Sequence, residues 1–172
     1  MTSPEGGFRT NTEILEPNRI KACFDNNPES WEKKLESFPK YVRRQNITRF
    51  LALYELYKLI LPIKGSIIEC GVFRGFGFMT WVKLNAILEP VNFMRKIYGF
   101  DSFSGFPSVS KADTTGIAKD ISPGNLFSNS FDELTELVEI NDSTRFLGHM
   151  SNASLIKGDA LESIPLFLES NP

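Results

Sequence analysis

The chain has 172 residues, of which 41% are apolar and 23% charged, and its formal net charge is −2. This length and composition predict one globular domain with a buried core. Acidic and basic residues are mixed along the sequence, so no strongly basic face is expected and nucleic-acid binding is not favoured. A single histidine, His149, excludes a histidine-rich metal site.

Neither a membrane-spanning segment nor a signal peptide is predicted. No apolar run reaches the roughly 18 residues needed to cross a bilayer, and the first ten residues lack the charged-then-apolar order of a signal peptide. The two cysteines, Cys23 and Cys70, are expected to be free, with Cys70 a small buried residue inside an apolar run. We therefore expect a soluble cytoplasmic protein.

The first part of the chain, 1–42, is expected to be an arm that contains one short helix. Its first 18 residues are polar and carry prolines and adjacent glycines, which predicts a loose segment. A short helix follows, in which Trp31, Leu35 and Phe38 fall on one apolar face.

From residue 43 onward, predicted helices and strands alternate. Four segments carry apolar residues at helical spacing and are expected to form helices: 43–61, 78–88, 131–140 and 161–169. Three short apolar runs with β-branched residues are expected to form buried parallel strands: 66–70, 96–100 and 153–157. This order predicts an α/β fold, with a Rossmann-like parallel sheet and flanking helices over 43–172. The long polar stretch 102–129 is expected to be a functional or mobile loop.

The end of the first predicted strand carries an acid and a glycine turn, Glu69, Gly71 and Gly75. The dinucleotide spacing of glycines fails here, because Phe73 and Phe76 stand where glycines would be needed. An acid before the turn suits the ammonium and sulfonium groups of S-adenosylmethionine (SAM). The alternative is an ordinary tight turn, with Glu69 as a surface or capping acid.

The other two predicted strands also end at acidic residues, and ligands of such sheets bind beyond the carboxyl ends of the strands. Asp101 is placed to accept the ribose hydroxyls of either SAM or NAD, or else to form an Asx turn. Asp159 is placed to accept the adenine amino group, and it suits a helix N-cap equally well.

Two segments in the correct order resemble the macrocin O-methyltransferase family. They are Ile-Glu-Cys-Gly-Val-Phe-Arg-Gly at 68–75 and Ile-Tyr-Gly-Phe-Asp-Ser-Phe-Ser-Gly-Phe-Pro at 97–107, and the segment 157–165 also fits. The resemblance covers roughly 43–172. It implies a class I methyltransferase fold, SAM as methyl donor, a sugar or other small-molecule hydroxyl as acceptor, and a divalent metal, Mg²⁺.

The resemblance also implies roles for individual residues: the turn after the first strand would hold the methionine end of SAM, the second strand end the ribose, and the third the adenine. The implied cofactor-binding residues are Glu69, Gly71, Val72, Gly75, Asp101, Ser102, Asp159 and Ala160.

Two departures from the family limit these expectations. The family's metal-binding aspartates follow a fourth strand, so we expect this chain to hold only the three-strand half of the fold, without the metal ligands. The family's histidine in the long loop is also missing, which leaves His149, after the helix at 131–140, as either a candidate for the base or an ordinary loop residue. A sheet that ends at its first strand would expose an edge and favour homo-oligomers.

Two alternative functions stay open on the sequence. One is an NAD(P)-dependent oxidoreductase, which the glycine spacing disfavours. The other is a non-catalytic module built on part of a methyltransferase fold.

Overall fold

The computed structural model describes residues 10–106, 122 and 124–171. In chain order the elements are α1 (Asn11–Asn26), α2 (Trp31–Glu36), the 3₁₀ turn η1 (Phe38–Lys40), α3 (Arg44–Ile60), β1 (Ile67–Cys70), α4 (Phe76–Leu88), β2 (Ile97–Asp101), α5 (Phe131–Thr144), β3 (Ala153–Lys157) and α6 (Ala160–Ser170). In the described part of the chain, no helix is long and apolar enough to cross a membrane.

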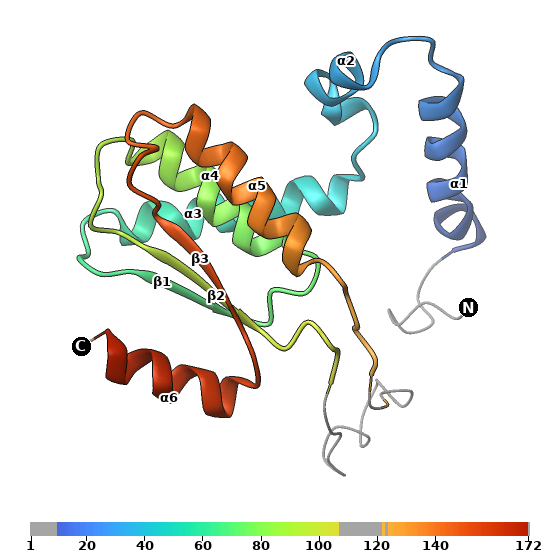
Figure 1. Ribbon diagram of the computed structural model, residues 1–172. Coiled ribbons are helices and arrows are strands. Elements are labelled where there is room, and N and C mark those ends of the chain that lie inside the picture. The colour runs from blue at the N-terminus through green and yellow to red at the C-terminus, as the bar shows by residue number, and fades with distance from the viewer. Residues whose placement is uncertain (1–9, 107–121, 123, 172) are drawn as a thin grey trace.

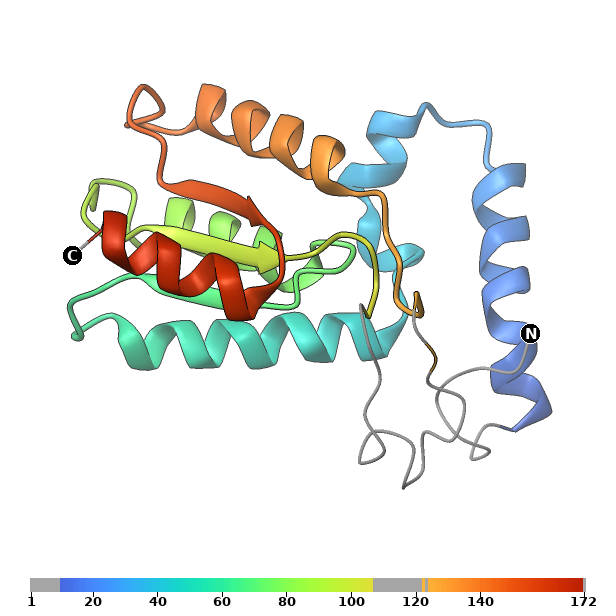
Figure 2. The ribbon, with the colours of Figure 1, turned by 60° about the horizontal axis from the view of Figure 1, so that its bottom comes forward.

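The three strands form one parallel sheet in the order β1-β2-β3, which confirms the predicted α/β fold. Cys70 lies opposite Phe100, and Asp101 lies opposite Lys157, so the strands end nearly level with one another. Helices α4 and α5 cover one face of the sheet and α6 covers the other, while α3 lies against α4 (Figures 1 and 2). The carboxyl ends of the strands therefore meet at one edge.

The main core lies between the sheet and the pair α4 and α5. Its buried residues are Val72, Phe78, Val82, Ile97, Phe103, Leu134, Val138 and Ala153. On the opposite face of the sheet, the ring of Phe167 in α6 lies 4.6 Å from that of Tyr98 and 5.4 Å from that of Phe100. These aromatic contacts hold α6 on the sheet.

A buried polar network closes the amino ends of the strands. The Arg95 guanidinium donates to the Glu89 carboxylate at 2.5 Å, and the Tyr57 hydroxyl and the Asn92 amide donate to the same carboxylate at 2.6 and 2.8 Å. Arg95 also donates to three main-chain carbonyls in the connection from α3 to β1: those of Ile60, Ile63 and Gly65. The network fixes where the chain enters the sheet.

The structure corrects the prediction of a loose N-terminal arm. Residues 11–26 form α1, although Pro17 lies inside it. Contacts from distant residues hold this helix: Arg43 pairs with Glu16 at 3.1 Å, and the Phe24 and Tyr41 rings meet edge to face at 4.9 Å. The hydrophobic pattern within a segment does not predict contacts with residues outside that segment. Residues 1–9 lie outside the described residues.

The burial predicted for the first strand was also wrong. The apolar face shared by Trp31, Leu35 and Phe38 is likewise not buried against the described residues, since these side chains are 67%, 59% and 53% exposed. Cys70 is exposed and Ile68 is 49% exposed. Both lie on β1, which is an edge strand and has a neighbouring strand on one side only.

Candidate functional site

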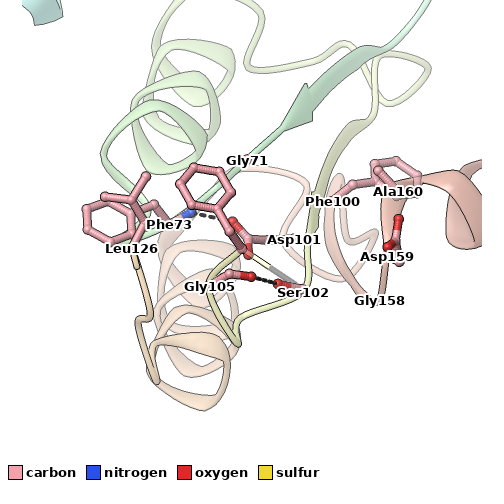
Figure 3. A pocket seen from close by; sticks show the side chains of 11 residues that line it. Gly71, Phe73, Phe100, Asp101, Ser102, Gly105, Leu126, Gly158, Asp159 and Ala160 are labelled. Atoms are coloured by element: carbon pink, nitrogen blue, oxygen red, sulfur yellow. Dashed lines mark hydrogen bonds between the residues drawn. The ribbon is translucent and has the colours of Figure 1, made fainter. Parts of the chain in front are cut away.

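A cavity of about 270 Å³ lies at the carboxyl ends of the three strands (Figure 3). The turn after β1, the end of β2 with its following loop, and the turn between β3 and α6 all contribute to it. The lining residues are Gly71, Phe73, Phe100, Asp101, Ser102, Gly105, Phe106, Leu126, Gly158, Asp159 and Ala160. Five of the eight predicted cofactor-binding residues are therefore together at one cavity, and Glu69, Val72 and Gly75 are not among its lining residues.

Asp101 organises the two loops beside this cavity. One carboxylate oxygen accepts the main-chain N–H of Phe73 and the other accepts that of Phe103, both at 2.7 Å. Both phenylalanines have left-handed backbones, with φ of 53° and 52°. That conformation costs a non-glycine residue roughly 1–2 kcal/mol, and a hydrogen bond to a charged group stabilises by about 1.5–3 kcal/mol. Since a carboxylate oxygen accepts two hydrogen bonds, each keeps a free lone pair.

Phe73 is held from its carbonyl side as well. The buried Ser130 hydroxyl donates to the Phe73 carbonyl at 2.6 Å, and it makes no capping hydrogen bond to α5. Two residues later Gly75 takes φ of 80°, and a Cβ there would lie 2.3 Å from a methyl carbon of Leu134. Val72 is a core residue at 3% exposure. Val72 and Gly75 therefore shape the turn from beneath.

Glu69 lies against the start of α4. Its carboxylate accepts the indole N–H of Trp81 at 2.7 Å, and a Cβ at Gly77 would lie 2.6 Å from each carboxylate oxygen. Burial raises the pKa of Glu69, and hydrogen bonds from Trp81 and from the Phe78 backbone oppose the shift. The absence of a side chain at Gly77 is what makes room for this carboxylate.

The two limbs of the long loop after β2 meet beside the cavity. The Phe106 N–H donates to the Asn125 carbonyl at 3.0 Å, and the Gly124 N–H donates to the Phe106 carbonyl at 2.9 Å. The Ser102 hydroxyl donates to the Gly105 carbonyl at 2.9 Å, as Figure 3 shows. These bonds place Leu126 on the cavity wall. Most of the predicted functional loop, 107–121 and residue 123, lies outside the described residues.

Asp159, at the end of the third strand, caps a helix, which is one of the two roles that its sequence position allowed. One carboxylate oxygen of Asp159 accepts the N–H of Leu161 at 2.9 Å and caps α6. The other oxygen is available to a ligand. His149 lies before β3, at the amino end of that strand, so about 16 Å of strand separates it from the cavity. This placement argues against His149 as the base.

The glycine turn is also unsuited to a dinucleotide. In that fingerprint the second glycine lets the backbone approach the pyrophosphate. Phe73 occupies this place, its side chain lines the cavity, and its N–H is already bound to Asp101. The geometry therefore disfavours an NAD site.

Several cavity residues were not predicted. They are Phe73, Phe100, Gly105, Phe106, Leu126 and Gly158. Gly105 and Phe106 belong to the loop motif that carried the family resemblance, which was the available signal for them. Leu126 had none, because it reaches the site across a long loop.

No group of three or more His, Cys, Asp or Glu side chains is placed to hold a metal ion within the residues that the structure describes. The carboxylates on the cavity wall are those of Asp101 and Asp159.

Two solved structures of CalS11 are similar to this chain. The crystal structure of the calicheamicin methyltransferase CalS11 matches with a TM-score of 0.87 and 28% identity, over 100% of this chain and 67% of that one. The apo structure of CalS11, a TDP-rhamnose 3′-O-methyltransferase in calicheamicin biosynthesis, matches with a TM-score of 0.77 and 26% identity, over 100% and 66%. No family model and no curated protein matches.

The chain has a methyltransferase fold. It spans about two thirds of the length of the CalS11 structures. The likeness supports a methyltransferase in general, and the macrocin O-methyltransferase family stays a resemblance of motifs.

Proposed function

We propose that this chain is the cofactor-binding part of a SAM-dependent O-methyltransferase. The observation that carries the proposal is the cavity at the carboxyl ends of three parallel strands, with the Asp101 carboxylate on its wall, in a fold that matches a sugar methyltransferase. The motif resemblance to macrocin O-methyltransferases supports the same reaction class.

The lining of the cavity fits SAM. No atom lies within 4 Å of the place where a Cβ of Gly71 would stand, so the backbone is open to a ligand. Free lone pairs of Asp101, with the Ser102 hydroxyl, suit the two ribose hydroxyls. The second oxygen of Asp159 suits the adenine amino group, and the Ala160 side chain is small enough to lie beside the purine.

Bound SAM would supply an electrophilic methyl group on its sulfonium. The protein's own part in such a transfer is to align a hydroxyl with that group and to exclude water. The CalS11 neighbour is a TDP-rhamnose methyltransferase, and this supports a sugar hydroxyl as acceptor. The described residues include no group of three or more His, Cys, Asp or Glu side chains that could hold a metal ion, and we derive no step through a metal.

Calorimetry with SAM, S-adenosylhomocysteine and NAD tests the proposal. We expect the two SAM compounds to bind and NAD not to bind. Asp101→Ala should weaken S-adenosylhomocysteine binding at least tenfold, since it removes acceptors for the ribose and releases both loops. Glu136→Ala, at an exposed acid on α5, is the matched control and should bind like the unmodified chain.

Two results would contradict this function. Binding of NAD alone would indicate an oxidoreductase. Folded protein that binds none of the three compounds would indicate a non-catalytic module.

A further inference from the structure

A second cavity, of about 440 Å³, lies between α1 and the beginning of α3. Its lining residues are Thr12, Glu16, Arg19, Ile20, Cys23, Lys40, Arg44 and Gln45. We call it the arginine groove, after Arg19 and Arg44. None of its residues lines the cavity at the strand ends.

The arginine groove carries positive charge that the protein does not neutralise. Its lone acid, Glu16, already pairs with Arg43 at 3.1 Å. Within the described residues, the side chains of Arg19 and Arg44 make no hydrogen bond and no ion pair. The Lys40 ammonium lies 3.6 Å from the Glu29 carboxylate, an exposed pair that is worth little.

The charge count points to an anion. Three lining cations, Arg19, Lys40 and Arg44, against one lining acid, Glu16, give a local charge of 3 − 1 = +2, on a chain whose net charge is −2. A concave surface lined by one sign of charge concentrates ligands of the other sign. Two guanidinium groups favour a ligand with paired oxygens, such as a phosphate or diphosphate.

The groove lies on the side of the molecule that holds the strand-end cavity. Helix α3 leads directly into the amino end of β1, so the helix begins at the carboxyl end of the sheet. Its 17 residues span about 25 Å and the four residues of β1 about 13 Å, so the helix begins beyond the strand's end. Figure 2 shows α1 on this same side, toward which the strands run.

A contact from α3 supports this placement. The Arg49 guanidinium lies 4.5 Å from the centre of the Phe76 ring, and Phe76 is the first residue of α4, directly after the glycine turn. Arg44 lies five residues earlier on α3, about 7.5 Å further along the helix axis. Arg44 is also turned by about 140° around the helix axis from Arg49, so the groove lies beyond the Arg49–Phe76 contact, on the strand-end side of the molecule.

We propose that the arginine groove binds the diphosphate of a nucleoside diphosphate sugar, the acceptor of the methyl group. The inference rests on the proposed function and names the substrate class for the same site. In such a compound the diphosphate is bonded to the sugar's anomeric carbon. One ligand would thus place its diphosphate between Arg19 and Arg44 and a ring hydroxyl at the cavity mouth.

Calorimetry with inorganic pyrophosphate, TDP-glucose and glucose tests the proposal. We expect both diphosphate compounds to bind and glucose alone not to bind. The double variant Arg19→Gln/Arg44→Gln should weaken both at least tenfold. The control Lys33→Gln/Lys58→Gln removes the same amount of charge from exposed positions outside the groove and should bind normally.

The outcomes separate this proposal from the proposed function. Equal binding of TDP-glucose by the double variant and its control would overturn the groove, and so would binding of pyrophosphate without TDP-glucose. S-adenosylhomocysteine is titrated into every variant. If it binds to the unmodified chain while TDP-glucose does not, the groove assignment fails and the methyl-donor site stands. If it does not bind to the unmodified chain, the proposed function fails.

A second measurement does not depend on the arginine variants. Cys23 lines the groove and is exposed, and Cys70 is also free. In Cys70→Ser protein, saturating pyrophosphate should slow the reaction of Cys23 with iodoacetamide at least threefold, while S-adenosylhomocysteine should leave it unchanged. An unchanged rate at saturating pyrophosphate would count against the groove.

Discussion

Each end of the sheet holds a carboxylate that accepts hydrogen bonds from several donors. The two ends differ in whether any acceptor capacity is left for a ligand. At the amino end, Glu89 accepts from Arg95, Tyr57 and Asn92. The Tyr57 hydroxyl also accepts from Asn85, and the other two side chains also bond to the backbone. At the carboxyl end, Asp101 accepts two main-chain N–H groups and lines a cavity. The first arrangement consumes hydrogen-bonding capacity inside the protein, and the second keeps some for a ligand.

The buried acids Glu69 and Glu89 sharpen the contrast. Burial raises the pKa of Glu69, because Trp81 and the start of α4 supply too few donors to offset it. Burial also acts on Glu89, but hydrogen bonds from Arg95, Tyr57 and Asn92 hold its pKa below the usual range. The carboxyl end of the sheet therefore disfavours the charged form of Glu69, whereas the amino end stabilises the charged form of Glu89.

Removing Arg95 should have the largest effect on stability. Arg95→Met leaves Glu89 buried without its cation and three carbonyls without their donor, and breaking a buried pair in this way costs about 3–5 kcal/mol. Urea unfolding, followed by circular dichroism, measures the loss. Lys58→Met, at an exposed position of α3, should stay within about 0.5 kcal/mol of the unmodified chain. A loss below about 1 kcal/mol for Arg95→Met would break the contrast between the two ends.

The two acids should give pH profiles of opposite slope. A depressed pKa gives Glu89 a stabilising contribution above its ordinary value of 4.5, which is lost as the pH falls through the lower folded value. The destabilisation caused by Glu89→Gln should therefore be greatest near neutral pH and shrink in acid.

The raised pKa of Glu69 works the other way. Its contribution is present below the ordinary value of 4.5 and is lost as the pH rises through the higher folded value. Relative to the unmodified chain, Glu69→Gln should therefore become more favourable as the pH rises. Urea unfolding between pH 4 and pH 8 tests both variants, and parallel slopes would show that the two ends do not differ as we describe.

Asp159 should show the smallest effect and separates capping from ligand binding. Asp159→Ala removes the cap of α6 and should cost about 1 kcal/mol, whereas Asp159→Asn, which also caps well, should cost only a few tenths. Both variants should weaken S-adenosylhomocysteine binding if the second carboxylate oxygen faces adenine, because the asparagine amide nitrogen does not accept a hydrogen bond. Unaltered affinity in both would leave Asp159 with the capping role alone.

The sequence predicted the sheet well because its strands are short, apolar and bounded by clear breaks. The predicted strand 153–157 coincides with β3, β1 begins one residue later than predicted, and β2 is shifted by one residue at both ends. The helix α1 was missed, since its ion pair with Arg43 and its ring contact with Tyr41 come from outside the segment. Local patterning does not register stabilisation of that kind.

The candidate site was predicted where residues follow strand ends, as Gly71, Asp101 and Asp159 do. It was not predicted where position depends on the direction of a side chain or on a long loop. Glu69 is adjacent to the glycine turn in sequence, yet its carboxylate points to Trp81. Leu126 reaches the cavity only because the loop returns to Phe106.

The paired limbs of that loop have an evolutionary consequence. Main-chain hydrogen bonds from Phe106 to Gly124 and Asn125 fix the points where the loop leaves and rejoins the site. When the two ends of a loop are joined in this way, doubling the length of the segment between them costs only about 0.6 kcal/mol of conformational entropy. Insertions, deletions and substitutions between these points therefore change the free energy of folding little. Homologues can differ there in length and sequence while the residues that line the cavity keep their positions.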